Sequence, residues 1–309
     1  MSTFEGHVYL DHHYPPILWN IVRGGFDSVD LLPEGEREFA ISVSLASMIQ
    51  NSSASRLEAE LSLELVRMAV APSSVSRLRG IFVFNDLDSI SRIWTSNKWG
   101  GHFIDEYLAD VGVYARRTTK VDAAWISDII SEQGKLLPGW REAAVSYWSG
   151  IAKIEAAPIW EILVEGSCCI RSMHSKEAAL KEISAIWPNS LGLLMHSMNC
   201  YGVGSQDGQS FPGLVGSDSD ISLNYYLRMV DSLDPQFIEK VAKLPIDKPK
   251  LFAGHPDPKK MHGPDLSGYS KVICPKDNDA FIKLLALLEA LQKMPVLNAF
   301  EEGRMSQPV

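Results

Sequence analysis

The chain has 309 residues, 46% hydrophobic and 22% charged, a composition typical of globular proteins and a length sufficient for two domains. Its formal net charge of −9 argues against a broad nucleic-acid-binding face, because neutralising phosphates requires a basic surface. No apolar run reaches the ~18 residues of a membrane span, and the first residues lack the pattern of a signal peptide. We therefore expect a cytoplasmic protein without membrane contact, with its four cysteines reduced.

Residues 6–26 contain the first predicted elements. Val8–Leu10 predict a strand, and Ile17–Arg23 predict a short helix that a Pro-Pro pair begins and a Gly-Gly pair ends. His12 and His13 lie between the two. Adjacent histidines at the end of a strand are surface residues, metal ligands or functional residues. The other histidines are scattered and offer no ligand spacing, so we assign no metal site.

Two helices follow, over residues 36–50 and Ser55–Val70, both with apolar residues at spacings of three and four. Ser55 is the expected N-cap of the second helix, with Glu58 completing a capping box. Glu58, Glu60 and Glu64 are expected on a solvated face of this helix.

Gly80–Trp94 is the most informative stretch. The apolar run Ile81–Phe84 predicts a strand, and Asp86 or Asp88 is the expected N-cap of the helix that follows. On spacing alone, this is an ordinary strand-to-helix corner of a globular core. Arg77 precedes the strand at a spacing of two from Arg79, so the two would share a face if that segment is extended.

A second strand is predicted at Ile162–Val164. Glu161 comes just before it, and a buried carboxylate needs a partner because an unpaired buried charge is costly. Glu161 is therefore either a salt-bridged residue at the end of a strand or a functional residue. Glu165 is followed by glycine and is expected in a turn.

Residues 171–309 contain no motif with a recognisable chemistry. Helices are predicted over 175–186, 221–233, 235–242 and 279–291, and the glycine-rich stretch 201–216 is predicted to be a loop.

Three motifs occur in this order along the chain: the histidines after the first strand, the strand that begins at Gly80, and the strand that begins at Glu161. Together they resemble the ADP-ribosyltransferase fold, in particular its poly(ADP-ribose) polymerase and diphtheria-toxin branch. The resemblance implies that His12 or His13 binds a ribose hydroxyl of NAD. It implies that Phe82 stacks on the nicotinamide, where that branch has a tyrosine, and that Trp94 or the neighbouring Ile93 forms the second wall of the pocket. The ring of Phe82 can stack but has no hydroxyl.

The same resemblance implies that Glu161 begins the catalytic strand. Its carboxylate would hydrogen-bond the nicotinamide ribose and stabilise the positive charge that develops as the glycosidic bond breaks. Arg77 or Arg79 would contact the pyrophosphate. Residue 159 is Ile, so the paired glutamates used for arginine acceptors are absent. Replacing Glu161 by Ala is then expected to lower the rate by about 10²–10³-fold with little loss of folding.

The expected fold is α+β, with split antiparallel sheets and flanking helices in residues 1–186 and a mainly helical domain or partner-binding appendage in residues 187–309. The expected activity is mono-ADP-ribosyl transfer from NAD to a protein or nucleic acid, or NAD hydrolysis. Such proteins resemble bacterial toxins or phage-defence effectors, and an antitoxin or other protein is an expected partner. Two alternatives remain: an inactive scaffold that binds a protein through its C-terminal helices, and a metal-dependent hydrolase using Asp11, His12 and His13.

Overall fold

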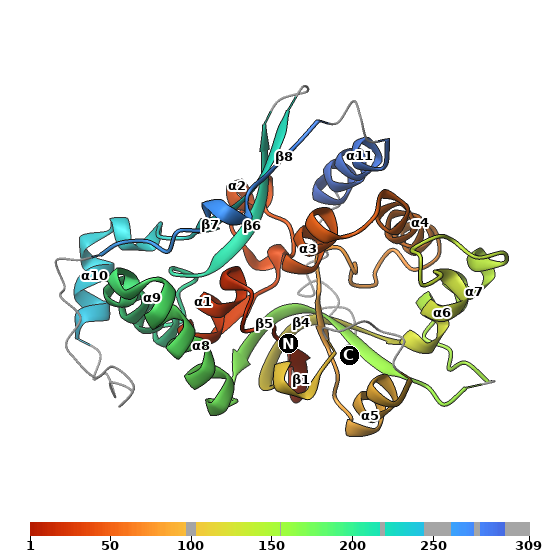
Figure 1. The fold of residues 1–309 in the computed structure, drawn as a ribbon, viewed down its shortest axis with the longest axis horizontal. Coiled ribbons are helices and arrows are strands. Elements are labelled where there is room, and N and C mark those ends of the chain that lie inside the picture. The colour runs from red at the N-terminus through yellow and green to blue at the C-terminus, as the bar shows by residue number, and fades with distance from the viewer. Residues whose placement is uncertain (97–102, 155, 217–219, 244–260, 275–278, 294–309) are drawn as a thin grey trace, which may run out of the picture.

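In a computed structural model the chain is an α+β protein with two antiparallel sheets (Figure 1). The structure describes residues 1–96, 103–154, 156–216, 220–243, 261–274 and 279–293. The strands of the first sheet are β1 (Ser2–Tyr9), β4 (Leu108–Asp122), β5 (Trp160–Ile170) and β2 (Gly25–Asp27), in this order, with β3 (Ile81–Val83) also paired to β5. The strands of the second sheet are β6 (Ser210–Gly216), β7 (Ile221–Leu227) and β8 (Lys271–Ile273).

Helices from both halves of the chain surround these sheets. The α-helices are α1 (Pro15–Arg23), α2 (Glu34–Arg37), α3 (Val43–Asn51), α4 (Ala54–Val70), α5 (Leu87–Ser96), α6 (Ile126–Ile129), α7 (Trp140–Trp148), α8 (Met173–Ile186), α9 (Leu191–Gly202), α10 (Pro235–Ala242) and α11 (Asp279–Lys293). The 3-10 helices are η1 (Val29–Leu31), η2 (Asp105–Tyr107), η3 (Ala123–Trp125), η4 (Pro188–Ser190), η5 (Asp231–Leu233) and η6 (Ser267–Tyr269).

Strand β3, which carries the middle motif, lies next to both β5 and β1. Val83 of β3 pairs with Ile162 of β5. The next residue, Phe84, exchanges two backbone hydrogen bonds with His7 of β1, with N–O distances of 2.7 and 2.9 Å. Because β1 also pairs with β4, the strand pairing runs from β1 through β4, β5 and β3 back to β1.

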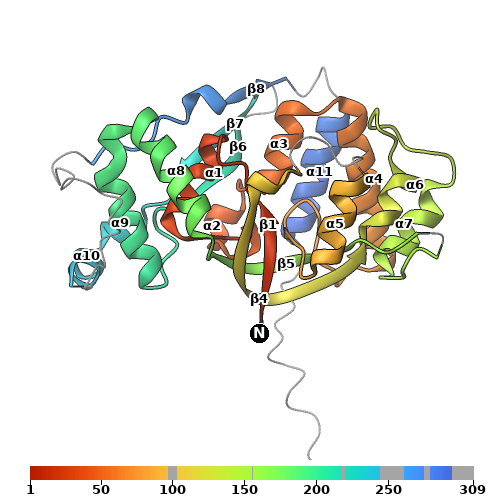
Figure 2. The same cartoon turned by 60° about the horizontal axis from the view of Figure 1, so that its bottom comes forward.

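Opposite sides of the first sheet pack on different helices (Figure 2). One hydrophobic cluster joins the sheet to α1, α8 and α9, with the indole of Trp19 fully buried. Another joins it to α4, α6 and α7 through Leu63, Tyr147 and Leu163. Burial of each large apolar side chain contributes about 1.5–3 kcal/mol, so these helices fix the positions of the strands.

The local predictions for α1, β3 and α5 are confirmed. Gly24 ends α1 with a φ of 116°, a left-handed conformation that favours glycine. Asp86 is the cap of α5, since its Oδ1 accepts a hydrogen bond from the backbone nitrogen of Ser89 (2.6 Å). The cap of α4 is Ser53 instead of Ser55.

Two predictions for the C-terminal half are wrong. Residues 221–227 form strand β7, where a helix over 221–233 was predicted, and part of the predicted glycine-rich loop forms β6. Ile221, Leu223 and Tyr225 are buried at alternate positions, which is the period of a strand. Glu165 also lies inside a strand, β5, where a turn was predicted.

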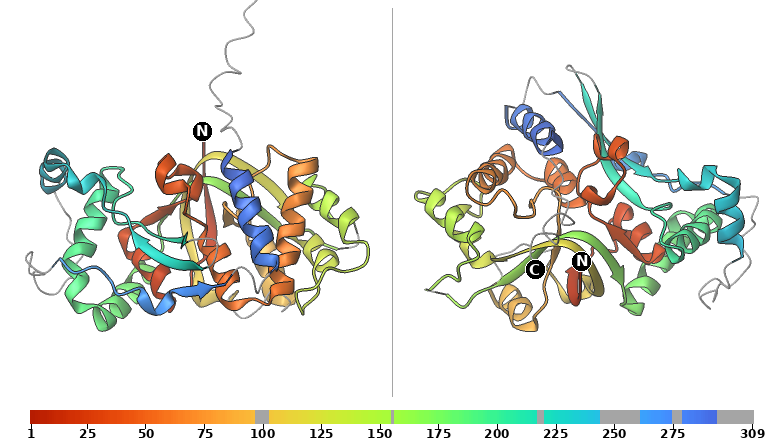
Figure 3. Two further views of the ribbon diagram at one scale, coloured as in Figure 1. Left: turned by 90° about the horizontal axis from the view of Figure 1, so that it is seen from above. Right: turned by 180° about the vertical axis from the view of Figure 1, so that it is seen from behind.

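Residues on both sides of position 186 share hydrophobic cores. Leu193 and Leu194 of α9 pack in the cluster that contains α1. Phe281 and Leu284 of α11 pack with α3 and with Leu57 of α4, and Figure 3 shows α11 running beside α4. The described residues beyond 186 therefore share their cores with the first half of the chain.

Among the described residues, none of the helices combines the length and the apolar character that a membrane span requires.

Candidate functional site

Arg77 is the centre of a buried group of polar side chains that includes Glu161. Its Nη1 donates hydrogen bonds to Glu161 Oε1 (2.5 Å) and to the hydroxyl of Tyr147 (2.5 Å). Its Nε donates to Glu60 Oε2 (3.2 Å). The Tyr147 hydroxyl in turn donates to Glu161. We call Glu60, Arg77, Tyr147 and Glu161 the Arg77 cluster.

Four separate elements supply these side chains. Glu60 comes from α4, Tyr147 from α7 and Glu161 from the start of β5. The arginine lies in a tight turn that ends at Gly80, just before β3. A Cβ at Gly80 would lie 2.7 Å from Val75 Cγ1, so a larger residue would force this turn apart.

Burial and mutual charge determine the ionisation of the Arg77 cluster. Glu161 is only 3% exposed, and its partners are buried too. Burial opposes the charge of Arg77, but its phenolic and acidic neighbours raise the pKa of its guanidinium well above the usual value. Burial also opposes ionisation of Glu60, yet Arg77 and Arg56 lower its pKa overall. Burial raises the pKa of Tyr147 far above normal, so its hydroxyl keeps its proton and serves as a donor.

Phe82 packs against this cluster. The guanidinium carbon of Arg77 lies 4.8 Å from the centre of the Phe82 ring, within the range of a cation–π interaction. Phe82 pairs with Leu163 of β5, so its ring lies on the same face of the sheet as Glu161, two residues before Leu163. The structure therefore brings together three of the predicted site residues, Arg77, Phe82 and Glu161.

Trp94 lies in a different group of aromatic residues. It is 41% exposed on α5. Burial raises the pKa of Tyr9 to about 12, and the neighbouring Trp94 side chain opposes this rise. Tyr9 packs edge-on against Phe84, in the cluster that also contains Ile93. Both candidates for the second wall of the pocket are thus associated with Tyr9 and Phe84, whereas Phe82 belongs to another hydrophobic cluster.

His12 and His13 lie in the turn after β1, beside Glu106 of η2. Their Nε2 atoms are 3.3 and 3.9 Å from Glu106 Oε1, respectively. His12 is buried, whereas His13 and Glu106 are exposed. We call these three residues the His12 group.

The two arginines before β3 do not share a face as predicted. Residues 77–79 form a turn and not an extended segment. Arg77 therefore enters the buried cluster, whereas Arg79 Nε donates to Asp30 Oδ1 (2.9 Å).

The prediction that three glutamates of α4 lie on a solvated face is wrong for two of them. Glu60 and Glu64 are buried, and Glu64 pairs with Arg67 at 2.9 Å. Helix α4 lies between α7 on one side and α11 on another, so it has more than one buried face. Glu58 alone is exposed, and it pairs with Lys283 of α11 at 2.9 Å.

Sequence reasoning missed Glu60, Tyr147 and Glu106. Glu60 pairs with Arg56 within α4, but its contact with Arg77 and the contacts of the other two residues form only through tertiary packing, which spacing within a single element does not encode. One available signal was the position of Glu60 between Ala59 and Leu61, two residues of an apolar-rich helix that are both buried.

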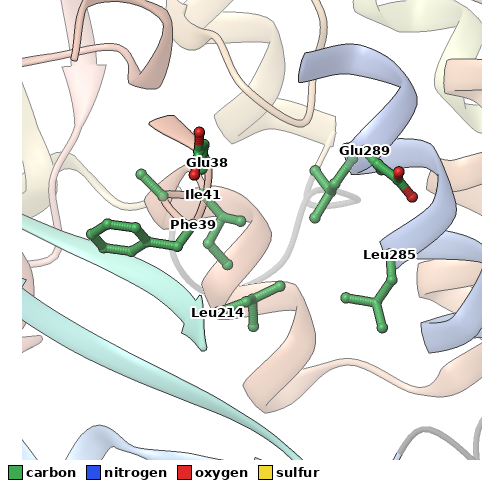
Figure 4. A pocket seen from close by; sticks show the side chains of 8 residues that line it. Glu38, Phe39, Ile41, Leu214, Leu285 and Glu289 are labelled. Carbon is green, nitrogen blue, oxygen red and sulfur yellow. The ribbon is translucent and has the colours of Figure 1, made fainter. Parts of the chain in front are cut away.

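A separate apolar pocket opens between α11, the end of β6 and residues 38–41 (Figure 4). Its volume is about 120 Å³, well below the ~300–1,000 Å³ of typical ligand sites. The lining residues are Glu38, Phe39, Ala40, Ile41, Leu214, Leu285, Leu288 and Glu289. None of the predicted site residues lines this pocket.

Comparison of the chain with protein-family models and with curated proteins gave no significant match.

Proposed function

We propose that the protein is a mono-ADP-ribosyltransferase that uses NAD and releases nicotinamide. The observation that carries this proposal is the meeting of Phe82, Arg77 and Glu161 on one face of neighbouring strands β3 and β5. Phe82 and Glu161 belong to two motifs that are far apart in the sequence, and β1, which precedes the third motif, pairs with Phe84 at the end of β3. An aromatic ring next to a carboxylate suits a positively charged nicotinamide and the ribose attached to it.

In this proposal Phe82 stacks on the nicotinamide and Glu161 hydrogen-bonds the nicotinamide ribose. The carboxylate stabilises the positive charge that grows on the ribose as the glycosidic bond breaks. Arg77 contacts the pyrophosphate, and His12 or His13 binds a ribose hydroxyl. The acceptor is a protein side chain, a nucleic-acid base or water. A toxin with a protein antitoxin is the biological role we propose for such an activity.

NAD binding in this way requires the Arg77 cluster to open. The guanidinium of Arg77 now lies against the Phe82 ring and pairs with Glu161, where the nicotinamide and its ribose would bind. Breaking a buried ion pair costs roughly 3–5 kcal/mol. An opening free energy of about 3 kcal/mol lowers apparent NAD affinity by about 100-fold, because each 1.4 kcal/mol is a factor of ten.

A second candidate function is a scaffold without catalytic activity that binds a protein partner through its C-terminal helices. Full engagement of the buried Glu161 by Arg77 and Tyr147 favours this candidate. Its binding surface would include η5 and α10, where Val230, Leu233 and Ile238 are exposed. Leu233 is 81% exposed, and contiguous apolar exposure is typical of protein-binding surfaces.

Incubation with labelled NAD and whole-cell lysate tests the two candidates. Label should enter a protein or nucleic-acid fraction, and Glu161→Gln should reduce this transfer about 10²–10³-fold. Asp207→Asn is the matched control, because Asp207 is a buried carboxylate paired with Arg228, far along the chain from the motifs. Transfer equal in wild type and Glu161→Gln would refute the assignment. Absence of transfer, nicotinamide release and NAD binding would leave the scaffold.

A further inference from the structure

The turn after β1 and the 3-10 helix η2 bring two imidazoles and one carboxylate to a single point. The candidate ligand atoms of His12, His13 and Glu106 all lie within 4.8 Å of one another. The shortest separation joins His12 Nε2 and Glu106 Oε1, at 3.3 Å. Two ligands of one tetrahedral zinc ion, each about 2.0–2.2 Å from the metal, are about 3.4 Å apart. The His12–Glu106 separation therefore already matches a shared metal ion.

Backbone hydrogen bonds hold the two segments together. Leu10 N donates to Tyr107 O (2.7 Å), which fixes the end of β1 beside η2. Asp11 Oδ1 accepts from His13 N (2.8 Å) and shapes the turn that carries both histidines. The ring of His12 packs edge-on against Tyr107, with ring centres 5.4 Å apart. The ring of His13 also lies edge-on to Tyr107, with ring centres 6.2 Å apart. The position of the ligand group is thus set by the backbone and by these aromatic contacts.

His12 is a buried histidine whose Nε2 lies beside a carboxylate oxygen of Glu106. The residue is 5% exposed, and its Nδ1 has no hydrogen-bond partner among the described residues. Its Nε2 points to Glu106, and the His13 ring centre lies 4.4 Å from its own. His13 and Glu106 are exposed, so rotation of their side chains can shorten the His13–Glu106 separation of 3.9 Å.

We propose that His12, His13 and Glu106 bind a divalent transition-metal ion, with Zn²⁺ as the preferred ion. Two imidazoles and one carboxylate suit zinc and its neighbours, whereas Mg²⁺ and Ca²⁺ require oxygen ligands. Three protein ligands leave a fourth position open for water or for a ligand atom. The sequence indicated His12 and His13 as alternative metal ligands together with Asp11, but the third ligand in the structure is Glu106 of η2.

This metal site shares no residue with the Arg77 cluster, but it contains both histidines that are candidates for binding the ribose of NAD. Zn²⁺ therefore competes with NAD for the imidazole that binds the ribose and inhibits transfer in a saturable manner. The zinc titration uses no NAD, so the metal site and the proposed ADP-ribosyl transfer can fail separately.

The test is a zinc titration of the full-length protein without a histidine tag, after removal of metals with a chelator and with its thiols blocked. We expect one equivalent of Zn²⁺ to bind in competition with a chromogenic chelator, and Mg²⁺ to leave the signal unchanged. His12→Ala, His13→Ala and Glu106→Gln should each lower zinc affinity by about 100-fold or more, a larger loss than the 10–100-fold typical of outer-shell residues.

His7→Ala is the matched control variant. His7 lies on β1 and pairs with a carboxylate, Asp110, at 2.9 Å, but it belongs to no group of three candidate ligands among the described residues. Zinc affinity should be unchanged in this variant. Should His12→Ala fail to fold, the two exposed ligands still test the proposal. Failure of wild type to bind one equivalent, or zinc binding that survives substitution of His13 and Glu106, would overturn it.

Discussion

The Arg77 cluster and the His12 group both place glutamate oxygens against nitrogen atoms, yet burial gives them different properties. Glu161 is surrounded by Arg77 and Tyr147 under three helices. Glu106 is exposed and lies beside the imidazoles of His12 and His13. In the Arg77 cluster the charged side chains are buried and pair with one another. In the His12 group the side chains of His13 and Glu106 are exposed and can be reached by a ligand from solution.

The energetic consequence is a difference in what each carboxylate contributes to stability. Removing one member of a buried pair leaves an uncompensated charge and costs roughly 3–5 kcal/mol. An exposed pair contributes about 0–1 kcal/mol. The comparison therefore predicts that the Arg77 cluster contributes strongly to the free energy of unfolding and that the His12 group contributes little.

The largest expected effect is that of Glu161→Ala. It leaves the guanidinium of Arg77 without one of its two buried carboxylates and should lower the free energy of unfolding by about 3–5 kcal/mol. Urea unfolding measures this change. The sequence-based expectation of little loss of folding is thereby revised, and Glu161→Gln is the better variant for activity because it preserves volume.

Glu106→Ala provides the contrast, with an expected loss below about 1 kcal/mol. Equal losses in the two alanine variants would break the comparison.

An intermediate effect, between those of the two alanine variants, is expected for Asp207→Asn, which tests whether a buried carboxylate elsewhere in the molecule behaves like Glu161. Asp207 is fully buried and accepts hydrogen bonds from Arg228 Nη1 (2.5 Å) and from the backbone nitrogen of Ser232 (2.6 Å). Loss of its charge should cost roughly 1.5–3 kcal/mol, the value of hydrogen bonds to charged groups. Unfolding in urea should show this loss while nicotinamide release per folded molecule stays unchanged. An equal fall in release per folded molecule would mean that the loss in Glu161→Gln is not specific to the Arg77 cluster.

The smallest effect is a pH dependence caused by His196. Burial lowers the pKa of this imidazole, and the nearby Asp207 only partly opposes the shift. Below about pH 6.5 the unfolded chain binds a proton at this residue and the folded protein does not, so stability falls as the pH falls. His196→Gln should flatten the dependence of the urea midpoint between pH 7.5 and 5.5. His7→Gln, at a partly buried histidine paired with Asp110, is the control. An unchanged slope in His196→Gln would show that other groups set the pH dependence.

Local structure was predictable where a few neighbouring residues determine it. The helix of residues 15–23 has prolines at its start and a glycine at its end, and the corner at Asp86 has an apolar strand before it and a capping carboxylate. Strand β7 was missed although Ile221, Leu223 and Tyr225 alternate with polar residues. The ion pairs were not predictable, because Glu60 meets Arg77, and His12 meets Glu106, only once distant elements have packed.

The central claim is tested most directly by nicotinamide release from NAD by the purified protein. Wild type, Glu161→Gln and Asp207→Asn should be compared at equal concentrations of folded protein. The account predicts release by wild type and by Asp207→Asn, and a fall of about 10²–10³-fold in Glu161→Gln. Release that is unchanged in Glu161→Gln, or no NAD binding by wild type, would contradict it and would leave the Arg77 cluster with a structural role only.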